Sequence, residues 1–421
     1  MTMTMTMTMT MTIHRRLTIR WTVGAALCGL GSLCVAVAQN QTQTQTETQT
    51  ALQDRTAALD RVITTQMAKA NVMGLAAAVI VDRQVVWMAG YGFADHRRSR
   101  PFTPDTVMNV ASITKAFTGV AMMRAVQEGK LALDADINTY LPFRVVNPHH
   151  PDATITLRHL ATHTSGIVDR PEVYVRTYYY GADVPPPLGR FLGQYFTPGG
   201  ADYAKSNFLD ARPGTQRAYC NICAGLAGYI VERAFGQPLN AYTRQHILTP
   251  LQMTRSGWSL SEVDAAAHST LFVAQNGQVI PIPHYSGTTY PDGGLRTSVA
   301  DLSRFFLAML KDGEHDGARI LDASTAREMQ RFQWTDAQRP ENFPAKDGNS
   351  GLFWRTKFSG TLVGHGGNDP GVQTDMLANL SRRNGVILFM NTSLSGADAR
   401  AASVIFDALW AHAEAPRSAA Q

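Results

Sequence analysis

Two hairpin patterns near opposite ends of this 421-residue chain limit the folds that it can adopt. In each pattern two apolar runs flank a short polar turn, which is typical of paired antiparallel strands. The runs cover 75–81 and 85–91 in the first hairpin, and 375–380 and 386–391 in the second. The second turn contains Asn384-Gly385, a strong hairpin signal. Because chain ends tend to lie close together in compact domains, we expect both hairpins to share one antiparallel sheet.

Helical patterns accompany the strands at both ends. They cover 52–70, a segment that begins near Ser112 and runs to about 127, and 397–412. Between the two ends the chain reads mostly as helices and long loops. We therefore predict an α/β (α+β) fold in which helices flank an antiparallel sheet. The predicted single domain spans 51–415, with an α/β lobe from about 51–130 and 288–415 and an inserted, mostly helical lobe from about 131–287.

The first 38 residues are typical of a signal peptide. They comprise a charged segment with Arg15, Arg16 and Arg20, an apolar stretch over 21–35, and small residues at 36–38. The alternative is an uncleaved membrane anchor, because the apolar stretch is nearly long enough to span a bilayer. Polar low complexity over 39–50 predicts a disordered spacer. We expect an exported protein, periplasmic or secreted, without stable membrane insertion after cleavage.

Charge argues against nucleic-acid binding. The formal net charge is +5, but three of the 38 basic residues lie in the predicted signal peptide. Their removal leaves 35 bases against 33 acids, and no basic stripe remains. A nucleic-acid partner is therefore not expected.

A serine and a lysine three positions apart, Ser112 and Lys115, stand where a helix is expected to begin. Positions three apart share a helix face, so the amine can activate the hydroxyl for covalent catalysis. The helix start also points N–H groups and partial positive charge at developing negative charge. The alternative is that Ser112 is an ordinary helix N-cap and Lys115 a solvated surface lysine.

A second pattern places Tyr219 and Asn221 just before a helical segment over 222–231. A phenol can move a proton while the amide binds substrate, although a buried tyrosine beside an Asn cap is a common structural arrangement. Cys220 and Cys223 can pair in an oxidising compartment or remain two small, partly buried residues. The sequence leaves both questions open.

A third pattern is the glycine-rich run 364–371, which we expect to follow a short strand over 361–363. Glycines let a substrate lie against strand backbone, and His365 can donate to a leaving group or bind a carboxylate. The alternative is a glycine-rich turn that holds a structural histidine.

Two other patterns carry less chemistry. His159 and His163 have the spacing of a helical zinc pair, but no glutamate lies between them and no third ligand is evident, so no metal is expected. An aromatic cluster lines the cleft or forms core of the helical lobe; its members are Tyr174, Tyr178, Tyr179, Tyr180, Tyr195, Phe196 and Tyr203. The chain has no Gly-x-Ser-x-Gly elbow, which argues against an α/β-hydrolase.

In this order and spacing, the three patterns resemble those of the serine β-lactamase, penicillin-binding protein and esterase superfamily. The class C β-lactamase and DD-peptidase-like branch is the nearer match. The resemblance runs from about residue 74 to 392 and includes two further segments typical of that branch, 160–167 and 292–298.

This resemblance implies a role for each matching residue. Ser112 would be acylated, and Lys115 and Tyr219 would share the work of the general base. Asn221 would hold the substrate amide and Lys115. His365 stands where many β-lactamases carry a lysine, so a fixed positive charge for a β-lactam carboxylate is missing there near pH 7.

The resemblance also implies an oxyanion hole. Its two donors would be the backbone N–H groups of Ser112 and Asn368, the latter just past the glycine pair Gly366 and Gly367. Cys220 occupies a position that the family usually fills with serine or alanine.

We therefore expect an exported serine hydrolase that cleaves an amide or ester bond in a small-molecule or peptide-like substrate. An acyl-enzyme on Ser112 would carry the reaction, with no metal or organic cofactor. The alternative chemistry at this site is that of a β-lactamase or a D-Ala-D-Ala carboxypeptidase. A second alternative is a non-catalytic penicillin-binding or sensor protein. The sequence leaves the oligomeric state open.

Overall fold

The computed structural model describes residues 50, 53–181, 185–275 and 278–415. The predicted signal peptide lies outside these residues, as does the predicted spacer apart from its last residue. Within the described ranges, no helix combines the length and apolar character needed to cross a membrane.

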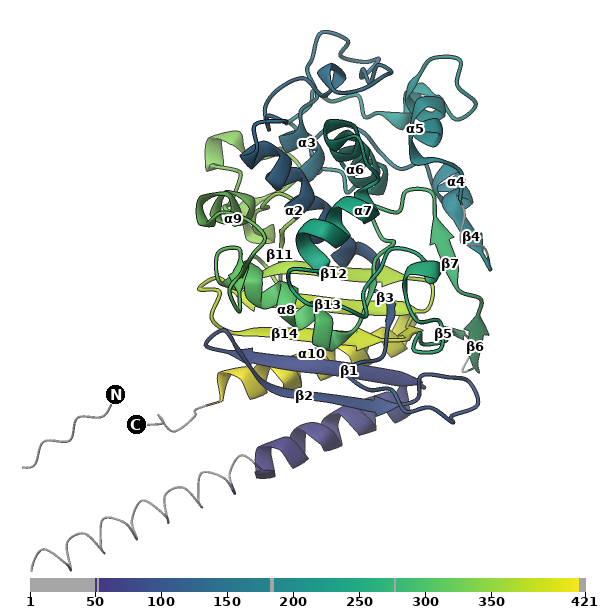
Figure 1. Ribbon diagram of the computed structural model, residues 1–421, viewed down its shortest axis with the longest axis vertical. Helices are drawn as coiled ribbons and strands as arrows, with labels where there is room; N and C mark the ends of the chain where they lie inside the picture. The colour runs from purple at the N-terminus through teal and green to yellow at the C-terminus, as the bar shows by residue number, and fades with distance from the viewer. Residues whose placement is uncertain (1–49, 51–52, 182–184, 276–277, 416–421) are drawn as a thin grey trace, which may run out of the picture. The chain divides into compact units, whose positions relative to one another are not determined.

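A six-stranded antiparallel sheet joins the two ends of the described chain (Figure 1). Its order is β11 (Arg355–Lys357), β12 (Leu362–Asp369), β13 (Val372–Asn379), β14 (Gly385–Met390), β1 (Gly74–Val81) and β2 (Gln84–Gly92). Both predicted hairpins are present, and they meet where β1 pairs with β14 from Leu75 opposite Met390 to Ile80 opposite Gly385. The predicted sheet built from both chain ends is thus confirmed.

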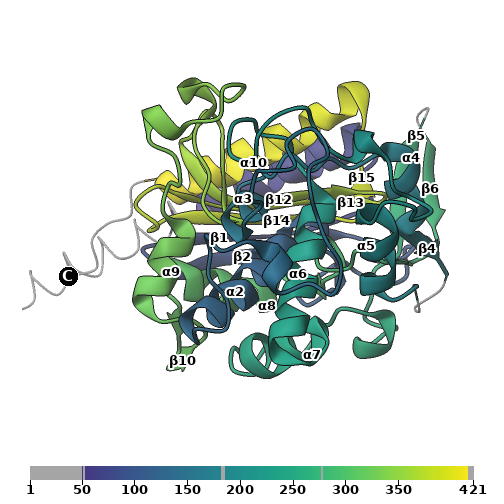
Figure 2. The same ribbon diagram turned by 90° about the horizontal axis from the view of Figure 1, so that it is seen from above.

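Strand β1 is buried on both faces because helices cover both sides of the sheet. Successive strand side chains point to opposite faces. Ala76, Ala78 and Ile80 belong to the larger apolar core, whereas Leu75, Ala77 and Val79 belong to the smaller one. The smaller core includes side chains of α10 (Ala399–Glu414) and of the helical segment 53–69. Figure 2 shows α10 on one side of the sheet and α2, α6 and α8 on the other.

The remaining helices lie mostly between the two ends of the sheet in sequence. They are α2 (Thr114–Gln127), α3 (Leu157–Ala161), α4 (Pro171–Tyr174), α5 (Leu188–Phe196), α6 (Asn221–Phe235), α7 (Leu239–Thr243), α8 (Val299–Leu310) and α9 (Ala323–Gln330). Short strands pair as β3 (Met108–Asn109) with β8 (Arg296–Thr297), β4 (Tyr178–Tyr180) with β7 (Tyr285–Gly287), and β9 (Glu314–His315) with β10 (Ala318–Arg319). A further small sheet contains β15 (Thr392–Ser393), β5 (Leu271–Gln275) and β6 (Gln278–Ile282).

One predicted boundary is wrong. The glycine-rich run does not follow a short strand over 361–363, because β12 continues through it to Asp369. Along its whole length β12 pairs with β13, and Asp369 lies opposite Val372 at the turn. This pairing outweighs the low strand propensity of glycine. The helical lobe also contains the short strands β4 to β7, which the sequence analysis did not identify.

Candidate active site

Ser112 lies in the tight 3₁₀ turn η1 (Ala111–Ile113), directly before α2. The residue before it, Ala111, has φ of 48°, a backbone conformation that costs energy for any residue except glycine. The backbone N–H of Val110 donates to Leu295 O at 3.0 Å and fastens this turn to the 292–298 segment. Ser112 makes no capping hydrogen bond, so the structure does not support the N-cap alternative.

Lys115 is fully buried and points at Ser112. Its Nζ lies 3.0 Å from Ser112 Oγ, 2.7 Å from Asn221 Oδ1 and 2.9 Å from the backbone oxygen of Asp292. Three segments far apart in sequence therefore meet at one amine, and the solvated-surface alternative for Lys115 is wrong.

The Tyr219 ring lies beside this amine. Lys115 Nζ is 5.1 Å from the ring centroid, and the guanidinium of Arg355 is 5.5 Å from it. Tyr219 Oη is buried and has no hydrogen-bond partner among the described residues. The phenol is therefore free to bond to a substrate or to an incoming water.

Asp169 fixes the start of α6, which carries Asn221. Its carboxylate accepts the backbone N–H groups of Asn221 at 2.7 Å and Ile222 at 2.9 Å. Cys220 and Cys223 form a disulfide in the same turn, with 5.3 Å between their Cα atoms. The sequence analysis missed Asp169, because a cap 52 residues before its helix leaves no local signal.

The 160–167 segment holds the irregular stretch that carries Tyr219. His163 Nδ1 accepts the backbone N–H of Cys220 at 3.2 Å, and its backbone oxygen accepts that of Ala218 at 2.9 Å. Burial lowers the pKa of His163 well below its usual value, so the ring is neutral and can accept. Its ring also contacts that of Tyr219, with 4.4 Å between centroids. No group of three metal-ligating side chains occurs within the described part of the chain.

His365 lies on β12 and is buried. Its Nδ1 is 2.7 Å from Gly366 O, so Nδ1–H donates there and Nε2 is left as the acceptor. Nε2 is buried without a hydrogen-bond partner among the described residues. Burial lowers the pKa of His365 well below its usual value, and the charges of Arg355 and Lys115 lower it further. The side chain is thus neutral near pH 7.

The lack of a side chain at Gly367 lets β12 approach the Ser112 turn. A Cβ on Gly367 would lie 2.4 Å from the backbone oxygen of Val110, whereas a Cβ on Gly366 would lie 2.5 Å from Lys357 Nζ. Thr374 on β13 adds a hydrogen bond of 3.0 Å to the same Val110 oxygen. Asn368, the next residue of β12, has an exposed side chain. Its backbone reaches the site edge only because no side chain separates β12 from η1.

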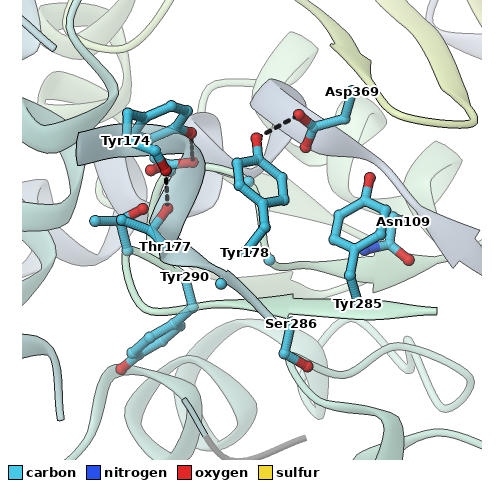
Figure 3. Close-up of a pocket in the computed structure, with 13 residues that line it drawn as sticks. Asn109, Tyr174, Thr177, Tyr178, Tyr285, Ser286, Tyr290 and Asp369 are labelled. Atoms are coloured by element: carbon cyan, nitrogen blue, oxygen red, sulfur yellow. Dashed lines mark hydrogen bonds between the residues drawn. The ribbon is translucent and has the colours of Figure 1, made fainter. Parts of the chain in front are cut away.

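A narrow pocket of tyrosines and carboxyl groups adjoins the Ser112 turn (Figure 3). Tyr174 Oη donates to Asp292 Oδ1 at 3.1 Å, and Tyr178 Oη donates to Asp369 Oδ1 at 2.6 Å. Burial raises the pKa of Asp292 to about 6 and that of Asp369 to about 7. The sequence analysis gave neither aspartate a role, although both stand next to the glycine motifs.

The aromatic cluster divides between core and pocket. Tyr195 and Phe196 are buried in the larger core, whereas Tyr174 and Tyr178 line the pocket. Tyr180 is exposed.

A family model named "Beta-lactamase" matches residues 59–409. Protein flp of Staphylococcus aureus strain N315 is 23% identical over 348 residues, covering 80% of this chain and 63% of flp. Esterase EstB of Burkholderia gladioli is 29% identical over 247 residues, covering 56% of this chain and 58% of EstB. The octameric penicillin-binding protein homologue from Pyrococcus abyssi superposes with a TM-score of 0.69 at 25% identity, covering 85% of this chain and 76% of that chain.

The chain spans less than two thirds of the length of these two curated relatives. A structure of the D-amino acid amidase from Ochrobactrum anthropi SV3 also shares the fold, with a TM-score of 0.65 at 20% identity, covering 85% of this chain and 99% of that chain.

Proposed function

Because the chain belongs to the beta-lactamase family, a family of serine hydrolases, we propose that it hydrolyses an amide or ester bond through an acyl-enzyme on Ser112. The observation that carries this proposal is the buried contact of 3.0 Å between Lys115 Nζ and Ser112 Oγ. A nucleophile and base within hydrogen-bond reach, with the base oriented by further groups, is the arrangement that covalent catalysis requires.

The contacts of Lys115 support its role as base. Asn221 Oδ1 and the Asp292 carbonyl oxygen can only accept, so each takes an N–H of the amine. A neutral amine has two N–H groups, and both are then engaged. Its lone pair is left to face the Ser112 hydroxyl and can take the proton as Oγ attacks the substrate carbonyl.

Tyr219 would carry the proton onward to the leaving group. Its Oη has no partner among the described residues, and its ring lies against Lys115. Developing negative charge on the carbonyl oxygen would be stabilised by the backbone N–H groups of Ser112 and Asn368. Water would then release the acid from Ser112.

The surroundings of His365 favour peptidase, amidase or esterase activity over β-lactam hydrolysis. Because His365 is buried and neutral, it does not itself offer a fixed charge to a β-lactam carboxylate. Arg355, missed by the sequence analysis, lies close enough to lower the pKa of His365 and would supply a permanent charge beside Tyr219. Because of this charge, β-lactamase or D-Ala-D-Ala carboxypeptidase activity at the same site is the competing chemistry. A non-catalytic sensor protein is the second alternative.

We further propose that the protein is exported. The arginine-bearing and apolar segments over 15–35 support this proposal, and so does the disulfide between Cys220 and Cys223, since disulfides persist in oxidising compartments.

A substrate profile tests this function. Initial rates should be measured on p-nitrophenyl esters, amino-acid amides and nitrocefin for the wild type and Ser112→Ala. We expect burst kinetics with an ester or amide, slower turnover of nitrocefin, and loss of all activity in the folded Ser112→Ala protein. Nitrocefin turnover faster than that of every ester and amide would favour a β-lactamase instead.

A further inference from the structure

The pocket beside Ser112 contains the buried carboxyl group of Asp292, which interacts with the side chains of Thr289 and Tyr174. Asp292 is 5% exposed, and its Oδ2 has no hydrogen-bond partner among the described residues. Such an atom is costly to bury unless a donor or a cation meets it. Its second oxygen accepts from Tyr174, so Oδ2 is the acceptor left for a ligand.

The second carboxyl group, that of Asp369, faces the same pocket. Tyr178 donates to its Oδ1, and the side chains of Tyr174 and Tyr285 complete the wall (Figure 3). Aromatic rings and carboxylates together are the surroundings that favour an organic cation.

The charges around this pocket are not balanced. Lys115 is the cation that lowers the pKa of both carboxyl groups, while Asp169 raises that of Asp292. Asp369 otherwise faces the phenols of Tyr174, Tyr178, Tyr180 and Tyr285, whose pKa values it raises. With both carboxyl groups ionised, the pocket holds two negative charges, and a ligand cation would offset them.

The pocket adjoins both the Ser112 turn and the end of β12. Asp369 Oδ2 and the backbone of Ala111 both lie within 4 Å of the point that a Cβ of Gly293 would occupy. Ala111 directly precedes Ser112, and Asp369 directly follows Asn368, whose N–H is the proposed oxyanion donor. A group attached close to the scissile carbonyl would therefore enter between these residues.

We propose that Asp292 and Asp369 bind a primary ammonium group near the scissile carbonyl, so that the substrates are amides or esters of amino acids. This inference rests on the proposed hydrolase function, in which the scissile carbonyl lies at Ser112.

Binding to an inactive protein tests the pocket separately from catalysis. The Ser112→Ala protein should be titrated by calorimetry with alaninamide and with isobutyramide, in which a methyl group replaces the ammonium. At about pH 7.5 an amine with a pKa of about 8 is mostly charged. We expect alaninamide to bind at least roughly tenfold more tightly, because a hydrogen-bonded ion pair exceeds a neutral contact by that much.

Adding Asp369→Asn should remove that preference and leave isobutyramide binding unchanged. Asp152→Asn is the matched control, because that exposed carboxylate pairs with surface Arg212 and is not part of the pocket lining. The proposal would be overturned if the two amides bind equally or if neither binds. It would also be overturned if Asp369→Asn weakens the binding of both amides equally. If the wild type does not hydrolyse p-nitrophenyl butyrate, that result counts against the proposed hydrolase function. It leaves the ammonium-binding proposal untouched.

Discussion

Lys115 is the residue at which the site converges, and its environment explains why a buried amine is tolerated. Nζ has three oxygen neighbours, which satisfy its hydrogen-bonding capacity without a solvent contact. The ammonium form keeps all three bonds, whereas the neutral form keeps two and offers its lone pair to Ser112. The same three contacts would therefore serve both stability and the proposed proton transfer.

Replacing Lys115 by methionine should lower the rate of Ser112 acylation by about 10²- to 10⁴-fold, the usual contribution of a positioned base. Methionine preserves much of the side-chain volume but leaves Asn221 Oδ1 without its donor. Burst-phase kinetics on a p-nitrophenyl ester would measure the change, with thermal unfolding as the check on folding. Lys130→Met, at an exposed lysine, is the control. An acylation rate unchanged in Lys115→Met would exclude the proposed base.

Asp369→Asn should stabilise the protein above neutral pH. Burial raises the pKa of Asp369 from 3.8 to about 7, so burying the ionised form opposes folding once the pH exceeds these values. The native state holds the proton more tightly than the unfolded state, so this carboxyl group's contribution to stability falls as pH rises from about 4 to about 7. We expect a gain of about 1 to 3 kcal/mol near pH 8 and almost none near pH 4. Unfolding free energies at both pH values would check this, and equal gains would contradict it.

The sequence allowed the main site residues to be identified but not their supports. Ser112, Lys115 and Asn221 belong to short motifs with characteristic spacing, and the structure brings them into contact. Asp169 and Arg355 act across long sequence separations, and their own neighbours in the chain reveal nothing of their role. Such residues become visible only when the tertiary contacts are known.

Among the elements, α6 shows how one partly buried carboxylate, that of Asp169, can fix the turn that carries the proposed site residue Asn221. Its first turn holds Asn221, its N-terminal N–H groups bond to Asp169, and a disulfide closes the same turn. Helix N-termini need such acceptors because their first N–H groups have none within the helix.

Asp169→Ala should therefore lower stability by about 1 to 3 kcal/mol and also reduce kcat, because Asn221 and Tyr219 lose their fixed position. Asp169→Asn retains one side-chain acceptor oxygen. Its stability and its kcat should therefore lie between those of Asp169→Ala and the wild type. Chemical denaturation and ester hydrolysis would be compared with Asp152→Ala, which removes an exposed pair of little energetic value. If Asp169→Ala loses stability but keeps its full kcat, the carboxylate supports only the fold.

Strand β12 is the element whose boundary the sequence could not give. The strand contains three glycines, and glycine has low strand propensity, so local preference predicts a loop. Pairing with β13 and the close approach to η1 impose the extended conformation. The hairpins, by contrast, were predictable because their turns and apolar runs are local.

For the molecule as a whole, the decisive contact is that between β1 and β14, which joins residues about 300 positions apart. The site depends on it, because β12 and β13 belong to the same sheet, while the Ser112 turn packs against that sheet. Contacts between distant segments form late in folding and reduce its rate, because closing a long loop costs chain entropy before the contacts can form.

Hydrogen exchange should therefore show the slowest amides in β1, β13 and β14, whose opening requires unfolding of the whole sheet. Edge strand β2 exposes Val85 and Val86 and should exchange faster by local opening. Mass-resolved exchange of the native protein would test this order. Exchange of β1 as fast as that of β2 would show that the two chain ends do not form one cooperative sheet.

The central claim is that Ser112 carries the acyl group, activated by Lys115. Peptide mapping by mass spectrometry after reaction with a fluorophosphonate tests it most directly. The account predicts one adduct per chain on the peptide that contains Ser112, none in Ser112→Ala and much slower labelling in Lys115→Met. An adduct on another residue, or equal labelling of Ser112→Ala, would contradict it.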